Sequence, residues 1–269
     1  MLSLPTRRSG DDQKSRRKSL RRLVEFQGIR RLSVEQYRKH IRKIYDGPAG
    51  AMLALGSWVS LHEPLVGQIL RKREFDVTGC RRILDVGSGA GQILQHLIKA
   101  TGTDTQLVAF DLSHTMLKRA RGRISRATPH YVVGDMTELP FADGSFDCVT
   151  CGWVIEHLPD PRPGLREIAR VLRPGGRLLL AATEDTLPGV ITSHTWDCRT
   201  YNRQELREVS AEVGLPWQRE LWFTPLHRLL RMGGILVEAQ RAEISGAIST
   251  PPTAHSSGQE HAGNRAYRG

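Results

Sequence analysis

The sequence predicts an α/β protein with a mostly parallel, doubly wound sheet. Three observations support this fold class. Between residues 81 and 240, short apolar runs typical of buried strands alternate with segments whose apolar side chains recur at helical spacing. A glycine-rich turn follows the first run, and acidic residues stand at or near the ends of the first three runs. In a parallel sheet these ends meet at one edge, where ligands bind.

The chain of 269 residues is long enough for one large domain with additional segments. We expect a basic disordered tail over 1–22, a helical lid over 23–75, the main domain over 76–242 and a disordered tail over 243–269. Much of the net charge of +11 lies in the first tail, which we interpret as solvated. Nucleic acid or an anionic membrane surface is its less favoured partner. No apolar run of eighteen residues and no secretory signal is evident, so we expect a cytoplasmic protein.

Each element follows from its own pattern. Helical spacing appears between residues 32 and 73, with a break at 47–50. Further helices are predicted where apolar stripes follow capping residues, over 92–101, 113–125, 163–172 and 202–214. Strands are predicted over 81–86, 106–110, 130–133, 146–151, 177–182, 217–223 and 235–240.

The four cysteines do not predict a metal site. Cys148 and Cys151 form a C-x-x-C pair, but no second pair of cysteines or histidines accompanies it. The pair falls within a predicted strand, where positions three apart point to opposite faces. We interpret these residues, with Cys80 and Cys198, as reduced thiols.

The glycine-rich turn reads Asp85-Val86-Gly87-Ser88-Gly89-Ala90-Gly91. Glycine permits a sharp turn and close approach of a ligand to the backbone. A dinucleotide fold requires G-x-G-x-x-G, but its third glycine position is Gln92 here. A carboxylate at Asp85 would also repel a pyrophosphate. The turn therefore favours a ligand whose nearby end is cationic.

Two further acids follow the next two strands. Asp111 ends the second strand, where a carboxylate can accept both hydroxyls of a ribose. Asp135 follows the third strand, where it can accept a hydrogen bond from an adenine amino group, and the adjacent Met136 can pack on the ring. Together with the turn, these acids predict a nucleoside ligand.

These motifs, in this order, resemble those of class I S-adenosylmethionine-dependent methyltransferases, in particular the small-molecule group typified by ubiquinone and menaquinone biosynthesis. The resemblance runs from Ile83 to about Leu180. Its later motifs are Glu156-His157-Leu158-Pro159-Asp160 and Leu172-Arg173-Pro174-Gly175-Gly176. It implies a Rossmann-like, seven-stranded sheet with an antiparallel last strand.

The resemblance also implies the roles of particular residues toward S-adenosylmethionine. Asp85 would lie near the amino group of its methionine part, and Asp111 with Leu112 would lie at the ribose. Asp135 and Met136 would contact adenine, and Cys151 would line the floor beneath the sulfonium. The turn itself would hold the methionine part through Gly87, Ser88, Gly89 and Gly91.

Methyl transfer from a sulfonium needs alignment and exclusion of water, and a base only where the acceptor must lose a proton. His157 is the candidate catalytic base, with a packing role as the alternative. The apolar stretch 51–61 is a candidate lid. Other candidates for the substrate side are Tyr45, Trp58, His62, Glu63, Trp153, His194 and Trp196.

The residues after the fourth strand, Cys151-Gly152-Trp153-Val154, lack the Asn/Asp-Pro-Pro-aromatic run of enzymes that methylate amino groups of bases. We therefore predict a small, hydrophobic, lipid-like or quinone-like acceptor. The alternatives are an RNA- or protein-modifying enzyme recruited by the basic tail, a non-catalytic cofactor-binding module and, more distantly, a dehydrogenase.

Overall fold

The computed structural model describes residues 33–46, 62–124, 129–196, 198–230 and 233–243. The predicted tail 1–22, nearly all of the tail 243–269 and the candidate lid 51–61, with Trp58, lie outside the described residues. Among the residues that are described, no helix is both long and apolar enough to cross a bilayer.

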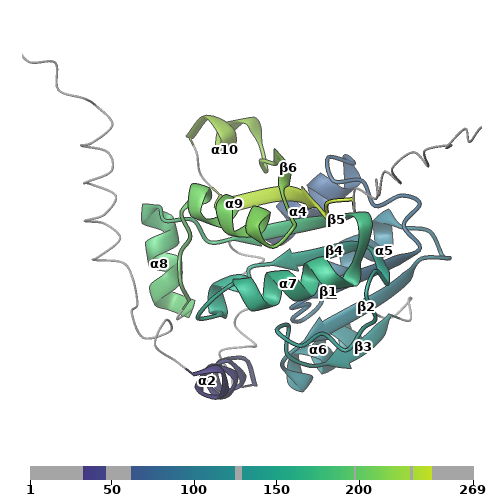
Figure 1. Ribbon diagram of the computed structural model, residues 1–269, viewed down its shortest axis with the longest axis horizontal. Helices are drawn as coiled ribbons and strands as arrows, with labels where there is room; N and C mark the ends of the chain where they lie inside the picture. Colours follow the sequence, from purple (N-terminus) through teal and green to yellow (C-terminus); the bar gives the residue numbers. More distant parts are fainter. Residues whose placement is uncertain (1–32, 47–61, 125–128, 197, 231–232, 244–269) are drawn as a thin grey trace, which may run out of the picture.

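A seven-stranded sheet forms the centre of the molecule (Figure 1). Its order is β3-β2-β1-β4-β5-β7-β6, and β1 to β5 pair in parallel. β7 runs antiparallel to both of its neighbours, which confirms the predicted antiparallel last strand. The strands are β1 (Arg82–Val86), β2 (Gln106–Asp111), β3 (His130–Val133), β4 (Phe146–Gly152), β5 (Leu172–Ala182), β6 (Trp217–Glu220) and β7 (Ile235–Gln240).

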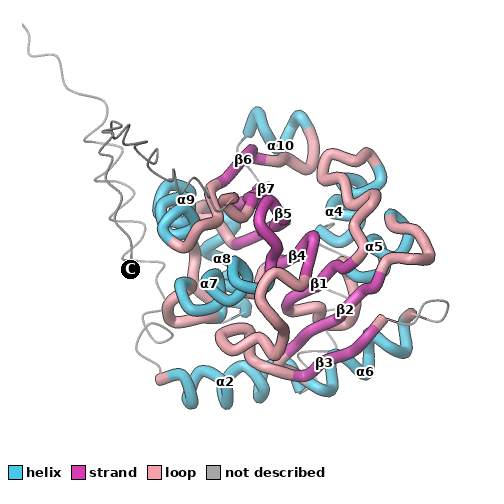
Figure 2. Tube along the Cα trace, turned by 45° about the vertical axis from the view of Figure 1, so that its right-hand side comes forward, coloured by secondary structure: helices cyan, strands magenta, loops and turns pink. Residues whose placement is uncertain are grey.

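Helices cover both faces of the sheet, as a doubly wound fold requires. Figure 1 shows α7 and α9 in front of the sheet and α4 and α5 behind it. Figure 2 shows α2 and α6 beside the β3 edge. The described helices are α2 (Val34–Asp46), α4 (His62–Arg71), α5 (Leu94–Ala100), α6 (His114–Arg123), α7 (Arg162–Val171), α8 (Leu187–Trp196), α9 (Arg203–Glu212) and α10 (Pro225–Leu230), with a 3₁₀ turn η2 (Ile155–His157).

The two faces of the sheet bury separate hydrophobic clusters. One cluster contains apolar side chains of α7 and α9, and the other contains those of α4 and α5. Side chains along β4 point alternately to the two faces of the sheet, so Cys151 belongs to the first cluster and Cys148 to the second. This confirms that the C-x-x-C cysteines point to opposite faces and cannot ligate one ion together.

The main differences from the sequence prediction lie after β5 and β6. Helices α8 and α10 were not predicted, because the first contains a glycine and β-branched residues without a clear apolar stripe and the second is short. β5 also begins at Leu172 rather than at residue 177. Hydrogen bonds of Gly175 and Gly176 with the main chain of Arg241 hold the intervening turn against the end of β7.

Candidate active site

A cavity of about 460 Å³ opens at the carboxyl ends of the parallel strands. β1 has β2 on one side and β4 on the other, so the chain winds away from β1 in both directions. Such a switch point leaves a crevice between the outgoing connections, and ligands of open α/β sheets bind there. Segments that follow β1, β2, β3, β4 and β5 all reach the cavity, and α2 and α4 contribute to its wall.

Among the described residues, acids outnumber every other kind of charged side chain that lines this cavity. Its lining contains the side chains of five acids and no lysine or arginine among the described residues. The acids are Glu63, Asp85, Asp111, Glu156 and Glu184. Glu63 is paired with Arg123 and Glu184 with Arg203, whereas the other three have no cationic partner in the described part of the chain. A chain with a net charge of +11 therefore encloses an anionic cavity.

The turn after β1 has the backbone that its glycines predict. Gly87, Gly89 and Gly91 have φ values of +66°, +54° and +83°, a region that side chains disfavour. Gly87 and Gly89 line the cavity together with Ser88. Gly91 does not. A Cβ there would stand 3.3 Å from the Cβ of Ala120, so this glycine allows close packing of the turn against α6 rather than contact with a ligand.

Asp85 is buried at the end of β1, with 1% of its surface exposed. It accepts hydrogen bonds from the hydroxyls of Ser88, at 2.7 Å, and Thr150, at 2.6 Å. Burial raises the pKa of Asp85 to about 6, although the two hydroxyls act in the opposite direction. A cationic group in the cavity would stabilise the ionised form.

Asp111 lies at the end of β2 and shapes the same cavity. Its carboxylate accepts from the backbone amide of Gly89 and from that of Ser113, each at 2.8 Å. Burial raises the pKa of Asp111 to about 6 despite these hydrogen bonds. The structure thus brings together Asp85, the glycine turn, Asp111 and Leu112, as the sequence predicts.

Asp135 is placed differently from the expectation. Its Oδ2 pairs with Nε of Arg38 on α2 at 2.5 Å, and its Oδ1 accepts from the amide and hydroxyl of Thr137. Burial opposes ionisation, but these partners prevail and hold the pKa of Asp135 below its usual range. Gly134 and Met136 line the cavity and Asp135 does not. The carboxylate anchors α2 instead of facing the cavity.

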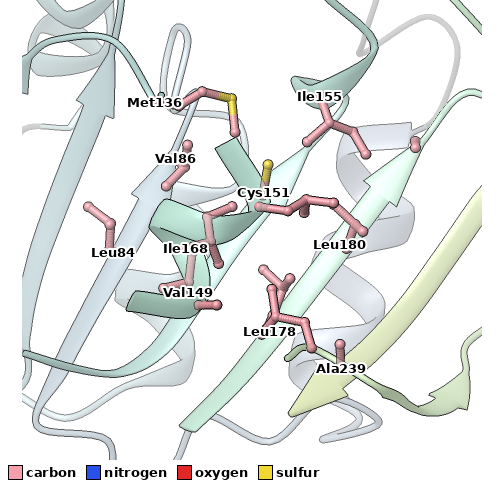
Figure 3. Close-up of a cluster of buried hydrophobic side chains, with 14 of the residues drawn as sticks. Leu84, Val86, Met136, Val149, Cys151, Ile155, Ile168, Leu178, Leu180 and Ala239 are labelled. Carbon is pink, nitrogen blue, oxygen red and sulfur yellow. The ribbon is translucent and has the colours of Figure 1, made fainter. Parts of the chain in front are cut away.

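Cys151 also lies outside the cavity lining. Figure 3 shows its side chain within the hydrophobic cluster, near Met136, Ile155 and Leu180. The pleat of β4 directs this residue into the core, and the next residue, Gly152, reaches the cavity in its place. The expectation that Cys151 forms the floor beneath a ligand is therefore not met.

His157 lines the cavity and is 6% exposed. Its Nε2 lies 2.6 Å from the hydroxyl oxygen of Tyr45, which belongs to α2. Burial, together with repulsion from His40, lowers the pKa of His157 to about 4. The imidazole is therefore neutral near pH 7, and its Nδ1 has no hydrogen-bond partner among the described residues.

The neighbouring Glu156 is the functional candidate that the sequence reading passed over. It is 2% exposed and lines the cavity. Its Oε1 accepts from the hydroxyl of Thr183 at 2.6 Å, and its Oε2 has no partner among the described residues. Burial raises the pKa of Glu156 to about 7. Glu156 is the first residue of the motif Glu156-His157-Leu158-Pro159-Asp160, but only the fold shows that its carboxyl is buried.

The remaining wall of the cavity is largely apolar and aromatic. Trp153 has a φ of +56°, unusual for a bulky residue, and its ring stacks against Phe223 with the centroids 6.4 Å apart. Other apolar lining residues are Ile41, Leu65, Val66, Ile93, Leu112 and Val154. Of the other sequence candidates, Tyr45, Glu63 and Trp153 reach the cavity, and His194 is exposed and does not.

Comparisons with known proteins identify the kind of domain that carries this cavity. Residues 84–180 match the family model described as a methyltransferase domain. The chain is 27% identical over 183 residues to the ubiquinone/menaquinone biosynthesis C-methyltransferase UbiE of Hahella chejuensis. That match covers 65% of this chain and 72% of the relative.

A second relative is a demethylmenaquinone methyltransferase of Desulfitobacterium hafniense, 35% identical over 112 residues. That match covers 40% of this chain and only 44% of the relative. Among solved structures, a complex of the Haloferax volcanii Trm112 methyltransferase activator with a methyltransferase superposes with a TM-score of 0.60 at 22% identity. It covers 72% of this chain and 97% of that chain, which shows a shared fold.

Proposed function

Because the chain carries a methyltransferase domain with the class I S-adenosylmethionine-dependent fold, we propose that it methylates a small, hydrophobic, quinone-like acceptor. The observation that carries this proposal is the anionic cavity beside the glycine turn. It contains five acids and no described lysine or arginine, and three of those acids have no cationic partner in the described residues.

This charge pattern selects between ligand classes. S-adenosylmethionine brings a sulfonium and an ammonium group, and both complement buried carboxylates. A dinucleotide or a nucleic acid brings phosphates, which such a cavity would repel. The acidic lining thus supports the methyl donor over the dehydrogenase and nucleic-acid alternatives.

The residues present fit the cofactor at the ends of β1 and β2. The positive φ values of Gly87 and Gly89 leave backbone beside the cavity where a side chain would not fit, since a Cβ on Gly87 would clash with Val154. We propose that Gly87, Ser88 and Gly89, with Asp85, hold the methionine part. Asp111 and Leu112 hold the ribose, and Met136 packs on the adenine. The bound cofactor supplies an electrophilic methyl group; the protein orients it and excludes water.

The acceptor is assigned to the apolar wall. Trp153 and Phe223 stack there, and aliphatic side chains of α2 and α4 extend the surface. A planar apolar ring would bury its faces on such a wall. The two curated relatives act, by their names, in quinone biosynthesis, which supports the same acceptor class here.

Helices α2 and α4 form the described part of the lid. Tyr37, Ile41 and Tyr45 of α2 and Leu65 and Val66 of α4 line the cavity. We assign His157 a positioning role, because its Nε2 is engaged by Tyr45 and links the lid to the turn after β4.

The test measures binding and transfer separately. Calorimetry with S-adenosylhomocysteine, and transfer of labelled methyl from S-adenosylmethionine to a short-chain demethylmenaquinol, should both be positive for the wild type. Asp111→Ala should weaken binding by about ten- to a hundredfold, because it removes a charged acceptor of hydrogen bonds. Asp104→Asn, on an exposed loop, is the control. Absence of binding by the wild type would contradict the proposal.

A further inference from the structure

We propose that Glu156 is the base that accepts the acceptor's proton during methyl transfer, an inference that rests on the function proposed above. It concerns a carboxyl that no sequence motif assigns to catalysis. Its basis is the combination of burial, an unpartnered oxygen and a position in the acceptor half of the cavity.

The two oxygens of Glu156 are not equivalent. Oε1 is held by the hydroxyl of Thr183, which fixes the side chain. Oε2 is buried and has no hydrogen-bond donor in the described residues. A buried carboxylate oxygen without a donor is costly, so a ligand that brings an O–H or other acidic hydrogen to this position would be stabilised. The side chain therefore presents a fixed acceptor with one vacant oxygen.

The strand order places this acceptor away from the nucleoside positions. Glu156 follows β4 and Thr183 follows β5, whereas Asp111 ends β2. β1 separates β2 from β4 in the sheet. A ligand held at Asp111 and at the turn after β1 consequently leaves the ends of β4 and β5 to the acceptor.

The groups around Glu156 leave its charge without a counterion. Electrostatic interactions link it to Tyr45 of α2, Cys151 of β4 and Tyr201 before α9, and burial raises the pKa of each of them above its ordinary value, so that all three are neutral. The guanidinium of Arg199 lies over the ring of Tyr201 and is paired with Glu205. Uncompensated burial therefore keeps the carboxyl close to half-protonated near neutrality, where a base transfers protons efficiently.

His157 is the less suitable base of this adjacent pair. Its Nε2 is engaged by the hydroxyl of Tyr45, and its low pKa makes it a weak proton acceptor. Glu156 has the free oxygen and the higher proton affinity. Since Nδ1 of His157 also has no partner among the described residues, it is the higher proton affinity of the carboxylate that decides in favour of Glu156.

The transfer step balances with Glu156 as the proton acceptor. The acidic O–H or C–H bond of the acceptor breaks, and its proton passes to Oε2. The electron pair left on the acceptor forms the new bond to the methyl carbon. The electrons of the methyl–sulfur bond remain on sulfur, which becomes a neutral thioether. The carboxylic acid formed at Glu156 returns its proton to water after product release.

The experiment compares Glu156→Gln with the wild type and with Glu208→Gln, an exposed control on α9. With S-adenosylmethionine and a short-chain demethylmenaquinol, Glu156→Gln should lower kcat at least a hundredfold at pH 7. Its Kd for S-adenosylhomocysteine should stay within about threefold of the wild type. The wild-type rate should rise between pH 6 and pH 8, and the residual rate of the variant should not.

A second variant and a second readout keep a folding defect apart from a catalytic one. Thr183→Val removes a hydrogen bond that lowers the pKa of Glu156, so the rising limb of the pH profile should move to higher pH. In the ligand-free protein, the raised pKa stabilises the folded wild type at low pH, and this contribution is lost as the pH rises through 7. The wild type alone loses this contribution, so the Tm of Glu156→Gln minus the Tm of the wild type should be larger at pH 8 than at pH 5.

The outcomes separate the two levels of the proposal. If Glu156→Gln has the same kcat as the wild type, or if its rate rises with pH as the wild-type rate does, the role of Glu156 is overturned while the proposed function stands. Failure of the wild type to bind S-adenosylhomocysteine would overturn the proposed function. Binding without any transfer to the demethylmenaquinol would overturn both the acceptor class and the proton transfer derived from it.

Discussion

At the scale of residues, the site is defined by carboxyls buried without counterions. Asp85 and Asp111 end adjacent parallel strands, and burial raises the pKa of each to about 6. Asp135 follows the next strand by two residues, but its pKa is lowered instead of raised, because Arg38 stabilises its charge. The partner, rather than the position at a strand end, decides which acid remains available to a ligand.

Binding of S-adenosylmethionine should therefore depend on pH. The cofactor prefers ionised Asp85 and Asp111, so protonation of these carboxyls competes with binding. Because a carboxyl with a pKa of about 6 is mostly ionised at pH 7 and mostly protonated at pH 5, the affinity should fall about tenfold in total between these two pH values for each carboxyl that must ionise. The cofactor's own carboxyl and amino groups do not titrate in this range. Calorimetry at four pH values measures the slope.

Asp85→Asn provides the control for that dependence. The asparagine keeps an oxygen that can accept from Thr150 but carries no titrating group, so the slope should become shallower. An affinity that does not change between pH 5 and pH 7 in the wild type would contradict the assignment of these acids to the cofactor.

The site was partly predictable at this scale. The register of the glycine turn and the acids at Asp85 and Asp111 follow from local spacing, and the structure brings them together. Asp135 and Cys151 lie outside the cavity lining, because one pairs with Arg38 about a hundred positions away and the other is directed into the core by the pleat of β4. Glu156 was missed because burial of an acid leaves no local signal in the sequence.

At the scale of elements, the turn after β1 combines two roles. Its first two glycines line the cavity and its third packs against α6. Gly91→Ala should lower the free energy of unfolding by about 1–2 kcal/mol, the typical strain of a side chain in the left-handed region. Its effect on affinity for S-adenosylhomocysteine should be small. Urea denaturation compared with Gly102→Ala, where a Cβ meets nothing within 4 Å, measures the effect.

Equal stability of the Gly91 and Gly102 variants would show that the turn relaxes around the added methyl group. A larger loss of affinity than of stability would place Gly91 at the ligand and contradict its assignment to packing.

The ion pair between Arg38 of α2 and Asp135, which follows β3, connects this helix to the carboxyl edge of the sheet. Arg38 pairs with Asp135 at 2.5 Å, and only 9% of the Asp135 side chain is exposed. Asp135→Asn should increase hydrogen exchange in α2 at least fivefold while the free energy of unfolding changes by less than about 1 kcal/mol, because Arg38 itself is partly solvated. Mass spectrometry of peptides from α2 measures the exchange.

Glu138→Gln is the matched control, since that acid is 79% exposed and lies 3.4 Å from the same arginine. If both variants leave exchange in α2 unchanged, apolar packing of Tyr37 and Ile41, rather than the ion pair, holds the helix.

At the scale of the whole molecule, charge is distributed unevenly. The chain has a net charge of +11, yet its cavity is lined by acids. The acidic cavity attracts cationic ligands and the basic N-terminal run attracts anionic ones, so the two features call for different partners. This difference supports a small cationic cofactor in the cavity and an anionic partner for the basic run.

Deletion of residues 1–22 should accordingly leave the site unaffected. The Kd for S-adenosylhomocysteine and the rate of methyl transfer to a short-chain demethylmenaquinol should remain within about twofold of the full chain. Both are measured at 150 mM salt, where interactions between solvent-exposed charges more than about 8 Å apart are largely screened. Loss of transfer on deletion, with labelled methyl appearing in RNA or protein only for the full chain, would instead support the recruited enzyme.

The antiparallel end of the sheet was implied by the resemblance to class I methyltransferases. The sequence by itself determined the alternation of strands and helices, apart from α8 and α10, together with the glycine turn and two of its acidic partners. These features are local, because hydrophobic period, glycine spacing and strand ends are written in consecutive residues. The tertiary structure decided which acids stay unpaired, which side chains line the cavity and that Glu156 is buried with a vacant oxygen. Those properties depend on burial and on partners distant in the chain, and burial sets the protonation of a carboxyl.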